Sequence, residues 1–147
     1  MATASQLEER LRNLNLRDIL IASIQETAAD YAVLNTNQLY EGVDGTGQKI
    51  APQYASEGYA DMKSKMNSAP GYGTPDLHLT GAFYRGYQLV VEGDELIKDS
   101  NVEYADELFE KYGNHIGQLD AENHEQYVDN TLAPVFYDKV REETGLI

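Results

Sequence analysis

Residues 76–119 read DLHLTGAFYRGYQLVVEGDELIKDSNVEYADELFEKYGNHIGQL, and this stretch predicts the core of the fold. Near its start, Thr80 is placed to cap a short helical turn. Two apolar segments, 88–91 and 96–97, then pair as a β-hairpin across Gly93-Asp94. These residues are not spaced for catalysis, so the stretch indicates a structural building block.

The second half of the stretch predicts a helix over residues 103–112. Its apolar side chains recur on one side of the helix. Gly113, just past the end, is typical of a helix C-terminus. A hairpin beside such a helix predicts a small α+β core.

Upstream of this core, the leucines of the first 35 residues recur at helical spacing. They predict a short leading helix and a longer one from about Leu16 to Leu34. Asn35, Thr36 and Asn37 are poor helix formers that favour turns, so we expect the longer helix to end there.

Three segments connect this helix to the core. Residues 38–50 predict a ribbon, with arms 38–40 and 48–50 joined by a glycine-rich loop. A helix over about 54–66 follows. Residues 67–75 contain two prolines and two glycines, and we expect this segment to be exposed and to become ordered only on contact with a neighbour.

The last helix begins after Asp120 as its N-cap and runs to about Glu143, before Gly145. Pro134 lies inside it, and proline removes one backbone donor and clashes with the preceding turn. We therefore expect a kink or a split near Leu132.

These elements predict one α+β domain over residues 1–147. It combines a small antiparallel β-sheet with a long N-terminal helix, C-terminal helices, and extended loops or arms. Residues 1–35 form the N-terminal helical segment, residues 36–119 the α+β core with the ribbon and the long loop, and residues 120–147 an acidic C-terminal helix.

The formal charge of −14 is concentrated in the last third of the chain. Residues 1–35 and 36–91 carry −2 and −1, whereas residues 92–147 carry −11, with four basic and fifteen acidic side chains. An acidic surface repels phosphates, which argues against nucleic-acid binding. Such a surface can serve to keep the protein soluble. The alternatives are that it binds a basic partner or that it mimics DNA.

The residues show no pattern typical of an active site. The chain has no cysteine and no Gly-x-Ser-x-Gly elbow, and its glycine-rich loop lacks the Gly-Lys-Ser/Thr end of a phosphate loop. His115 and His124 lie nine residues apart, which matches no helical metal pair, although nearby carboxylates leave a divalent-cation site as an alternative. We expect no catalytic residue, no metal and no cofactor.

The sequence predicts a soluble protein that is not exported. No apolar run approaches the roughly 18 residues that span a bilayer. The polar N-terminus also lacks the apolar region of a signal peptide.

Tyrosine is the most informative residue type, with eleven tyrosines against three phenylalanines and no tryptophan. Tyrosine suits positions that are half core and half interface, because its large ring is buried while its hydroxyl seeks a polar partner. We expect Tyr40, Tyr54, Tyr59 and Tyr72 to contact another subunit. We expect Arg85 either to hold an acidic group on a neighbour or to brace the acidic helix that follows the hairpin.

The order of elements and two short motifs resemble the small neck and tail-completion proteins of tailed bacteriophages, a group that includes head–tail joining, minor tail and virion-morphogenesis proteins. The group shares a Thr-Gly-x-Leu/Phe-x-Arg turn before a hairpin and a Tyr-Ala helix that leads into a Glu-x-Gly end, to which Glu110 and Gly113 correspond here with two residues between them. The resemblance covers roughly residues 38–119. The matching residues are Thr80, Gly81, Phe83 and Arg85 in the turn, and Tyr104, Ala105, Glu110 and Gly113 in the helix.

The resemblance implies a structural subunit of a virion that forms a ring, commonly of six or twelve copies, at the head–tail neck or the tail completion site. Its implied partners are ring neighbours and other neck, portal-adaptor or tail proteins, with DNA at most passing through the lumen and no membrane. The resemblance also implies that the subunit is assembled into the virion in the host cytoplasm. The C-terminal segment departs from the group, since Ala133-Pro134-Val135-Phe136 lies within an acidic helix. The alternative is an acidic DNA mimic or adaptor that inhibits a nucleic-acid-binding partner.

Overall fold

The computed structural model describes residues 3–93 and 95–145. It is an α+β structure, in which most of the regular elements are helices and a single hairpin supplies the strands. In chain order the elements are α1 (Ala4–Arg12), α2 (Leu16–Glu26), α3 (Ala28–Tyr40), α4 (Glu57–Met66), α5 (Ala82–Gly86), β1 (Tyr87–Glu92), β2 (Glu95–Ser100), α6 (Ala105–Tyr112), the 3₁₀ turn η1 (Asn114–Gly117), α7 (Ala121–Tyr127), the π-helical turn η2 (Val128–Leu132) and α8 (Ala133–Thr144).

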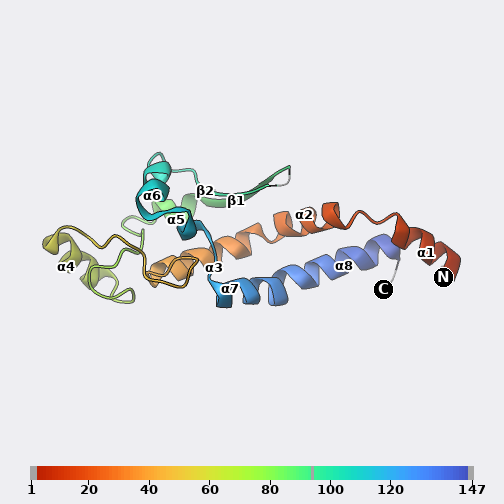
Figure 1. The fold of residues 1–147 in the computed structure, drawn as a ribbon, viewed down its shortest axis with the longest axis horizontal. Helices are drawn as coiled ribbons and strands as arrows, with labels where there is room; N and C mark the ends of the chain where they lie inside the picture. Colours follow the sequence, from red (N-terminus) through yellow and green to blue (C-terminus); the bar gives the residue numbers. More distant parts are fainter. Residues whose placement is uncertain (1–2, 94, 146–147) are drawn as a thin grey trace.

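The molecule is elongated, and an antiparallel pair of helical segments forms its long axis (Figure 1). The segment α1–α3 runs in one direction, and α7, η2 and α8 return beside it, with α2 against α8 and α3 against α7. Polar contacts join the pair along its length, among them Lys139 to Glu26 at 2.8 Å, the Thr27 hydroxyl to that of Tyr127 at 2.7 Å, and Arg10, which donates to the carbonyl of Thr144 at 3.1 Å. Helix α4 lies at one end of the long axis, and α1 with the end of α8 lies at the other (Figure 1).

The irregularity expected in the last helix is confirmed. Asp120 caps the start of α7 by accepting a hydrogen bond from Asn123 N at 2.9 Å. The helix then widens into the π turn η2, which ends at Leu132, and Pro134 stands in the first turn of α8. Since proline has no N–H to donate, the regular hydrogen-bond ladder is interrupted before it. Gly145 ends α8 in a left-handed conformation, as predicted.

The predicted hairpin is also confirmed. Strands β1 and β2 pair antiparallel, with Tyr87 opposite Ser100 and Leu89 opposite Lys98. The expected tip was Gly93-Asp94: Gly93 has a φ of 58°, and Asp94 lies outside the described residues. Strand β1 lies against α2 and α3. This packing is needed because a two-stranded hairpin alone is marginally stable.

The expected end of the N-terminal helix is wrong. The break lies at Thr27, and α3 continues through Asn35 to Tyr40. Asn35 and Gln38 are buried, and their side-chain amides donate to the carbonyl of Gln118 at 3.1 and 2.9 Å. The bond from Asn35 engages an amide that would otherwise compete with the helix backbone, although among the described residues the buried Asn35 Oδ1 has no hydrogen-bond partner.

The predicted ribbon at residues 38–50 is accordingly wrong in its first arm. Residues 38–40 belong to α3, and only one isolated bridge, Val43 to Lys49, remains of the pairing. Gly45 approaches the η1 region closely, because its N–H donates to the carbonyl of His115 at 2.8 Å. The glycine-rich loop therefore packs against the η1 region.

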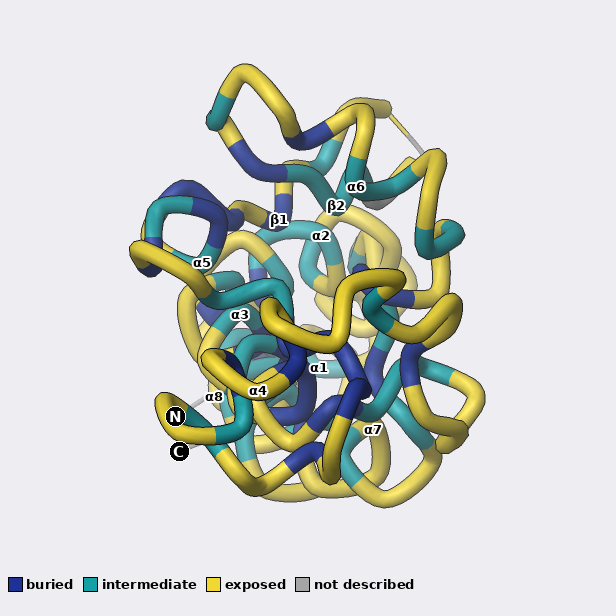
Figure 2. Tube along the Cα trace, turned by 90° about the vertical axis from the view of Figure 1, so that its left-hand side faces the viewer, coloured by how far each residue is buried: buried dark blue, intermediate teal, exposed yellow. Residues whose placement is uncertain are grey.

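The core lies where α3, the hairpin, α5 and α7 meet. Figure 2 shows buried stretches in the interior and exposed outer turns on the helices. The buried apolar side chains are Tyr31, Leu39, Ile50, Phe83, Tyr87, Leu89, Ala105, Ile116, Leu119 and Tyr127. The core thus draws on nearly every segment of the chain, and the helix over residues 103–112 contributes its predicted apolar side through α6.

Candidate subunit interface

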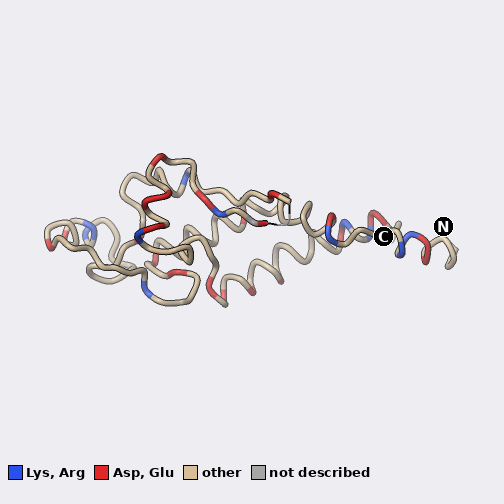
Figure 3. The backbone as a smooth tube through the Cα atoms, turned by 45° about the horizontal axis from the view of Figure 1, so that its top comes forward, with Lys and Arg blue, Asp and Glu red and all other residues tan. Residues whose placement is uncertain are grey.

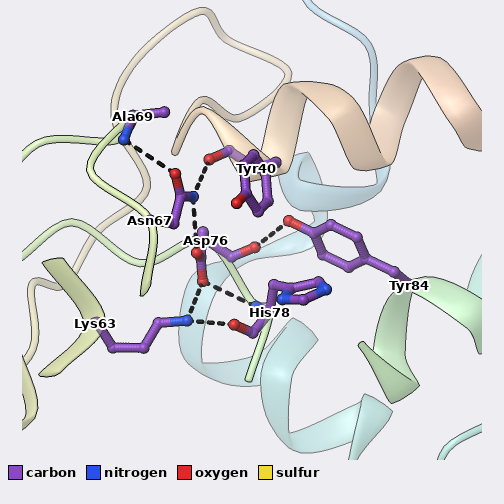
Figure 4. A network of polar contacts seen from close by, with 7 residues as sticks. All are labelled: Tyr40, Lys63, Asn67, Ala69, Asp76, His78 and Tyr84. Atoms are coloured by element: carbon purple, nitrogen blue, oxygen red, sulfur yellow. Dashed lines mark hydrogen bonds and ion pairs between the residues drawn. The ribbon is translucent and has the colours of Figure 1, made fainter. Parts of the chain in front are cut away.

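A buried ion pair organises the end of the molecule that carries α4 (Figure 4). Lys63 of α4 lies 2.8 Å from the Asp76 carboxylate, and the two side chains are 5% and 2% exposed. The carboxylate also accepts hydrogen bonds from the Asn67 side chain at 3.0 Å and from His78 N at 2.9 Å. A buried carboxylate is tolerated when its oxygens are satisfied in this way.

Backbone carbonyls around the pair are bound as well. Lys63 Nζ donates to the carbonyl of His78, and the Tyr84 hydroxyl donates to the carbonyl of Asp76. The Asn67 amide also donates to the carbonyl of Tyr40 at 2.7 Å, which ties this end to the last turn of α3. We call Lys63, Asn67, Asp76, His78 and Tyr84 the Asp76 network.

The Asp76 network overturns the expectation that residues 67–75 wait for a neighbour to become ordered. The loop turns inward before Asp76, and Gly73, Thr74 and Pro75 are buried. Ala69 N donates to the side chain of Asn67 at 3.0 Å. Polar contacts within the chain therefore order this loop, despite its prolines and glycines.

The predicted interface tyrosines gather around this end. Tyr54 and Tyr59 meet edge to face, with ring centroids 4.9 Å apart. Tyr40 meets the ring of His78, with a centroid distance of 5.7 Å. Tyr72 is exposed, and its hydroxyl donates to the Asp61 carboxylate at 2.6 Å. The structure thus brings together four residues that lie up to 32 positions apart in the sequence.

The surroundings of Tyr54, Tyr59 and Tyr72 raise the pKa of each hydroxyl. Burial, followed by the charge of Asp76, raises the pKa of Tyr54 and of Tyr59. The hydrogen bond to Asp61 raises the pKa of Tyr72 to about 12. At neutral pH these side chains act as neutral donors with apolar rings, which suits an interface better than acid–base chemistry.

An aromatic groove of about 350 Å³ opens beside the network. Its walls are tyrosine rings and leucines from α4, α6 and the chain before α5. Tyr59, Leu79 and Tyr104 reach solvent at its rim. We call this surface, lined by Tyr54, Tyr59, Lys63, Pro75, Leu77, His78, Leu79, Thr80, Ala82, Tyr104, Leu108 and Tyr112, the aromatic groove.

The predicted turn forms, but the residue that caps α5 is Gly81, one position after the expected Thr80. Gly81, with a φ of 82°, precedes α5, while the Thr80 hydroxyl accepts from Ala82 N at 3.3 Å. Phe83 is buried in the core. Arg85 donates to the carbonyl of Thr80 at 3.0 Å, inside its own turn, so its expected contact with a neighbour stays a prediction.

The later motif residues flank α6. Tyr104 precedes the helix and is exposed, and Gly113 follows it with a φ of 89°. A left-handed φ favours glycine at the end of a helix. The two motifs therefore mark the limits of short helices on either side of the hairpin.

Sequence reasoning missed the Lys63–Asp76 pair and the half-buried Lys98. A lysine on an amphipathic helix gives the same pattern whether its ammonium group is solvated or buried. Only Pro75, which precedes Asp76, hinted at a fixed conformation in the loop. No local pattern pointed to Lys98.

The charges are distributed as the sequence indicates, with acidic positions along the hairpin, α6 and α7 (Figure 3). Within residues 3–93 and 95–145, no three His, Asp or Glu side chains are grouped closely enough to hold a metal ion. None of the helices described is long and apolar enough to cross a membrane.

No protein family model, no curated protein and no solved structure matches this chain.

Proposed function

We propose that the protein is a structural subunit of a bacteriophage virion that forms a ring at the head–tail neck or the tail completion site. It acts by binding neighbouring subunits and other neck or tail proteins, and not as an enzyme. The observation that carries the proposal is an excess of exposed surface on an elongated, internally ordered chain.

The excess can be estimated from the molecular mass. A compact monomer of 16.4 kDa exposes about 7,500 Å². This chain exposes 9253 Å², which is about 1,700 Å² more. A specific interface typically buries about 800 Å² on each partner. The excess therefore corresponds to roughly two such faces, and a ring subunit needs two different faces, one for each neighbour.

The exposed apolar side chains support the same reading. Large apolar residues are exposed both near the N-terminal end, at Leu11 and Leu16, and near the α4 end, at Met66 and Tyr72. Exposed apolar surface on a soluble protein is typical of an interaction site when it is contiguous. Its presence at both ends of an elongated molecule suits contacts between unlike faces.

The turn, hairpin and α6 carry the residues that resemble the neck and tail-completion group, which supports the assignment to a virion. The acidic surface fits a subunit around a DNA passage, because like charge keeps the DNA mobile and unbound. In this proposal DNA passes through the ring without specific binding.

Light scattering coupled to size exclusion, followed by negative-stain imaging of the full chain, tests the proposal. We expect closed rings, and we expect antibodies against the chain to label the neck or tail of virions that carry it. A monomer that is absent from virions contradicts the proposal. If that monomer also competes with DNA for a nucleic-acid enzyme, the DNA-mimic alternative replaces it.

A further inference from the structure

A second groove, separate from the aromatic groove, lies between α2, the inner face of the hairpin and α7 with η2. It has a volume of about 380 Å³, and most of its lining is apolar. We call it the helix–hairpin groove, and we define it by Leu20, Ile24, Leu89, Lys98, Val128 and Leu132.

Lys98 is the only lysine or arginine among the described residues of this lining, which also includes His124. It stands opposite Leu89 in the hairpin register, which places it on the inner face of the sheet. Its Nζ lies 5.7 Å from the centroid of the Tyr31 ring. Burial lowers the pKa of Lys98. Among the described residues no carboxylate forms an ion pair with it.

An apolar stripe extends this groove along α2. Leu16, Leu20 and Ile24 lie one turn apart on the same side of the helix. Ile24 is packed against the core, whereas Leu16 is 53% and Leu20 is 40% exposed. The stripe is thus covered at one end only. It leads from solvent toward Lys98, whose ammonium group has no ionic partner among the described residues. A matching partner must bring apolar side chains and a carboxylate.

Helix α4 of a second copy has this chemistry. Met62 and Met66 are one turn apart on its surface, and they are 42% and 50% exposed. Asp61 is an exposed carboxylate beside them, and it can accept a further hydrogen bond in addition to the one from the Tyr72 hydroxyl. Methionine side chains adapt to irregular apolar surfaces, and an amphipathic helix in an apolar groove is a common mode of recognition.

The positions of the two surfaces favour contact between copies. Helix α4 lies at one end of the long axis, whereas α2 lies away from it, toward the end that carries α1 (Figure 1). A contact between them joins unlike faces of two subunits. After one contact the first subunit still has its groove free and the second still has its α4 free, so each can bind a further neighbour. The excess exposed area estimated above is large enough for both faces.

Building on the ring proposal, we propose that α4 of one subunit docks in the helix–hairpin groove of the next copy. Met62 and Met66 cover Leu16 and Leu20, and the Asp61 carboxylate accepts a hydrogen bond from Lys98 Nζ. Lys65 of the docked helix faces the acidic surface of α7.

Cysteine cross-linking tests this contact directly, because the chain has no cysteine of its own. Leu20→Cys is placed in a chain with one affinity tag, and Met62→Cys in a chain with another. After mixing and mild oxidation, we expect a disulfide-linked dimer that carries both tags. Val33→Cys mixed with Met62→Cys is the matched control, because Val33 is exposed on α3 outside the groove lining.

The lysine has a second test, which separates docking from folding. We expect Lys98→Met to weaken self-association by about 30-fold or more, because the docked carboxylate loses its partner. We expect the thermal midpoint of the isolated subunit to be unchanged or higher. The charge exchange Lys98→Asp with Asp61→Lys should restore association, and Lys111→Met on α6 is the control.

The outcomes distinguish this inference from the ring proposal. Rings that form without the mixed cross-link, and that tolerate Lys98→Met, overturn the α4 contact and leave the ring. A wild-type chain that stays monomeric at every accessible concentration and is absent from virions overturns both. A mixed cross-link together with loss of association in Lys98→Met supports the contact.

Discussion

Two lysines in this chain differ in how their charge is satisfied. Lys63 is almost fully buried, and its ammonium group meets the Asp76 carboxylate and the carbonyl of His78. Lys98 is half-buried beside the Tyr31 ring, and among the described residues it has no ionic partner. A buried charge that is fully paired fixes a conformation, whereas a desolvated charge without a partner favours binding of an anionic group.

The two regions around these lysines have different roles. The Asp76 network orders a proline- and glycine-rich loop and fixes α4 at one end. The helix–hairpin groove has an apolar lining and a cation that the described part of the chain does not neutralise. We infer that the first region is complete within one subunit and that the second is completed by another.

The largest effect is expected from Asp76→Asn. This change keeps the shape of the side chain but leaves the Lys63 ammonium group buried without its counter-ion. We expect a loss of about 3–5 kcal/mol in the free energy of unfolding, measured by urea denaturation. Asp61→Asn, at an exposed carboxylate, is the control and should change stability by less than about 0.5 kcal/mol. Equal effects of the two changes would remove the special role of the Asp76 network.

Alkaline pH should reduce stability through the buried tyrosines. Burial raises the pKa of Tyr31 to about 12, and burial with the charge of Asp76 raises that of Tyr84. Since these folded-state pKa values exceed the value of about 10 in unfolded chains, the tyrosines keep stability intact below about pH 10. Above that pH the unfolded state loses protons that the native state retains, and stability falls.

The expected slope is at most about 1.4 kcal/mol per pH unit for each tyrosine. Urea denaturation between pH 8 and about pH 11 measures this slope. Absorbance titration over the same range follows the formation of the phenolate. Tyr31→Phe should make the curve shallower. An unchanged slope in this variant would show that other groups control alkaline unfolding.

Tyr127→Phe should have an intermediate effect. It removes the hydroxyl that lies 2.7 Å from the Thr27 hydroxyl, between the two helical segments. Thr27 keeps its hydrogen bond to the carbonyl of Ser23 at 2.8 Å, so no buried donor is stranded. We expect a loss of about 1 kcal/mol by thermal or urea denaturation. A loss as large as that of Asp76→Asn would mean that the contact between the two helical segments depends on polar contacts as strongly as the α4 end does.

The smallest effect on the isolated subunit is expected from Lys98→Met. The change removes a half-buried charge that has no ionic partner among the described residues, and it keeps an apolar chain of similar length beside the Tyr31 ring. We expect the free energy of unfolding to change by less than about 0.5 kcal/mol or to increase. Lys63→Met is the matched comparison and should cost several kcal/mol, because it leaves Asp76 buried and unpaired. A large loss in Lys98→Met would place Lys98 among residues that hold the subunit together.

The sequence predicted the features that depend on neighbouring residues. The hairpin follows from two apolar segments around a glycine, and the start of α7 and the end of α6 follow from Asp120 and Gly113 as caps. The irregular helix follows from Pro134. In each case the physical cause lies within a few positions of the result, so a single chain segment contains the information.

The sequence did not predict features that depend on distant partners. Asn35, Thr36 and Asn37 favour turns in isolation, but α3 continues through them. The side-chain amides of Asn35 and Gln38 bind the carbonyl of Gln118, about 80 positions away. The contact of Tyr54 and Tyr59 with another subunit stays a prediction, and the Asp76 network near them was not predicted. A buried ion pair leaves no local signal, because lysine and aspartate look the same in a sequence whether solvated or paired.

The sequence by itself therefore determined the class of the fold, the hairpin, the helix limits near it and the acidic balance of the chain. The tertiary structure alone decided the length of α3, the order of the loop before Asp76, and which lysine is paired. The physical reason is that local propensity acts over one or two turns, whereas the burial of a polar group depends on partners from the whole chain.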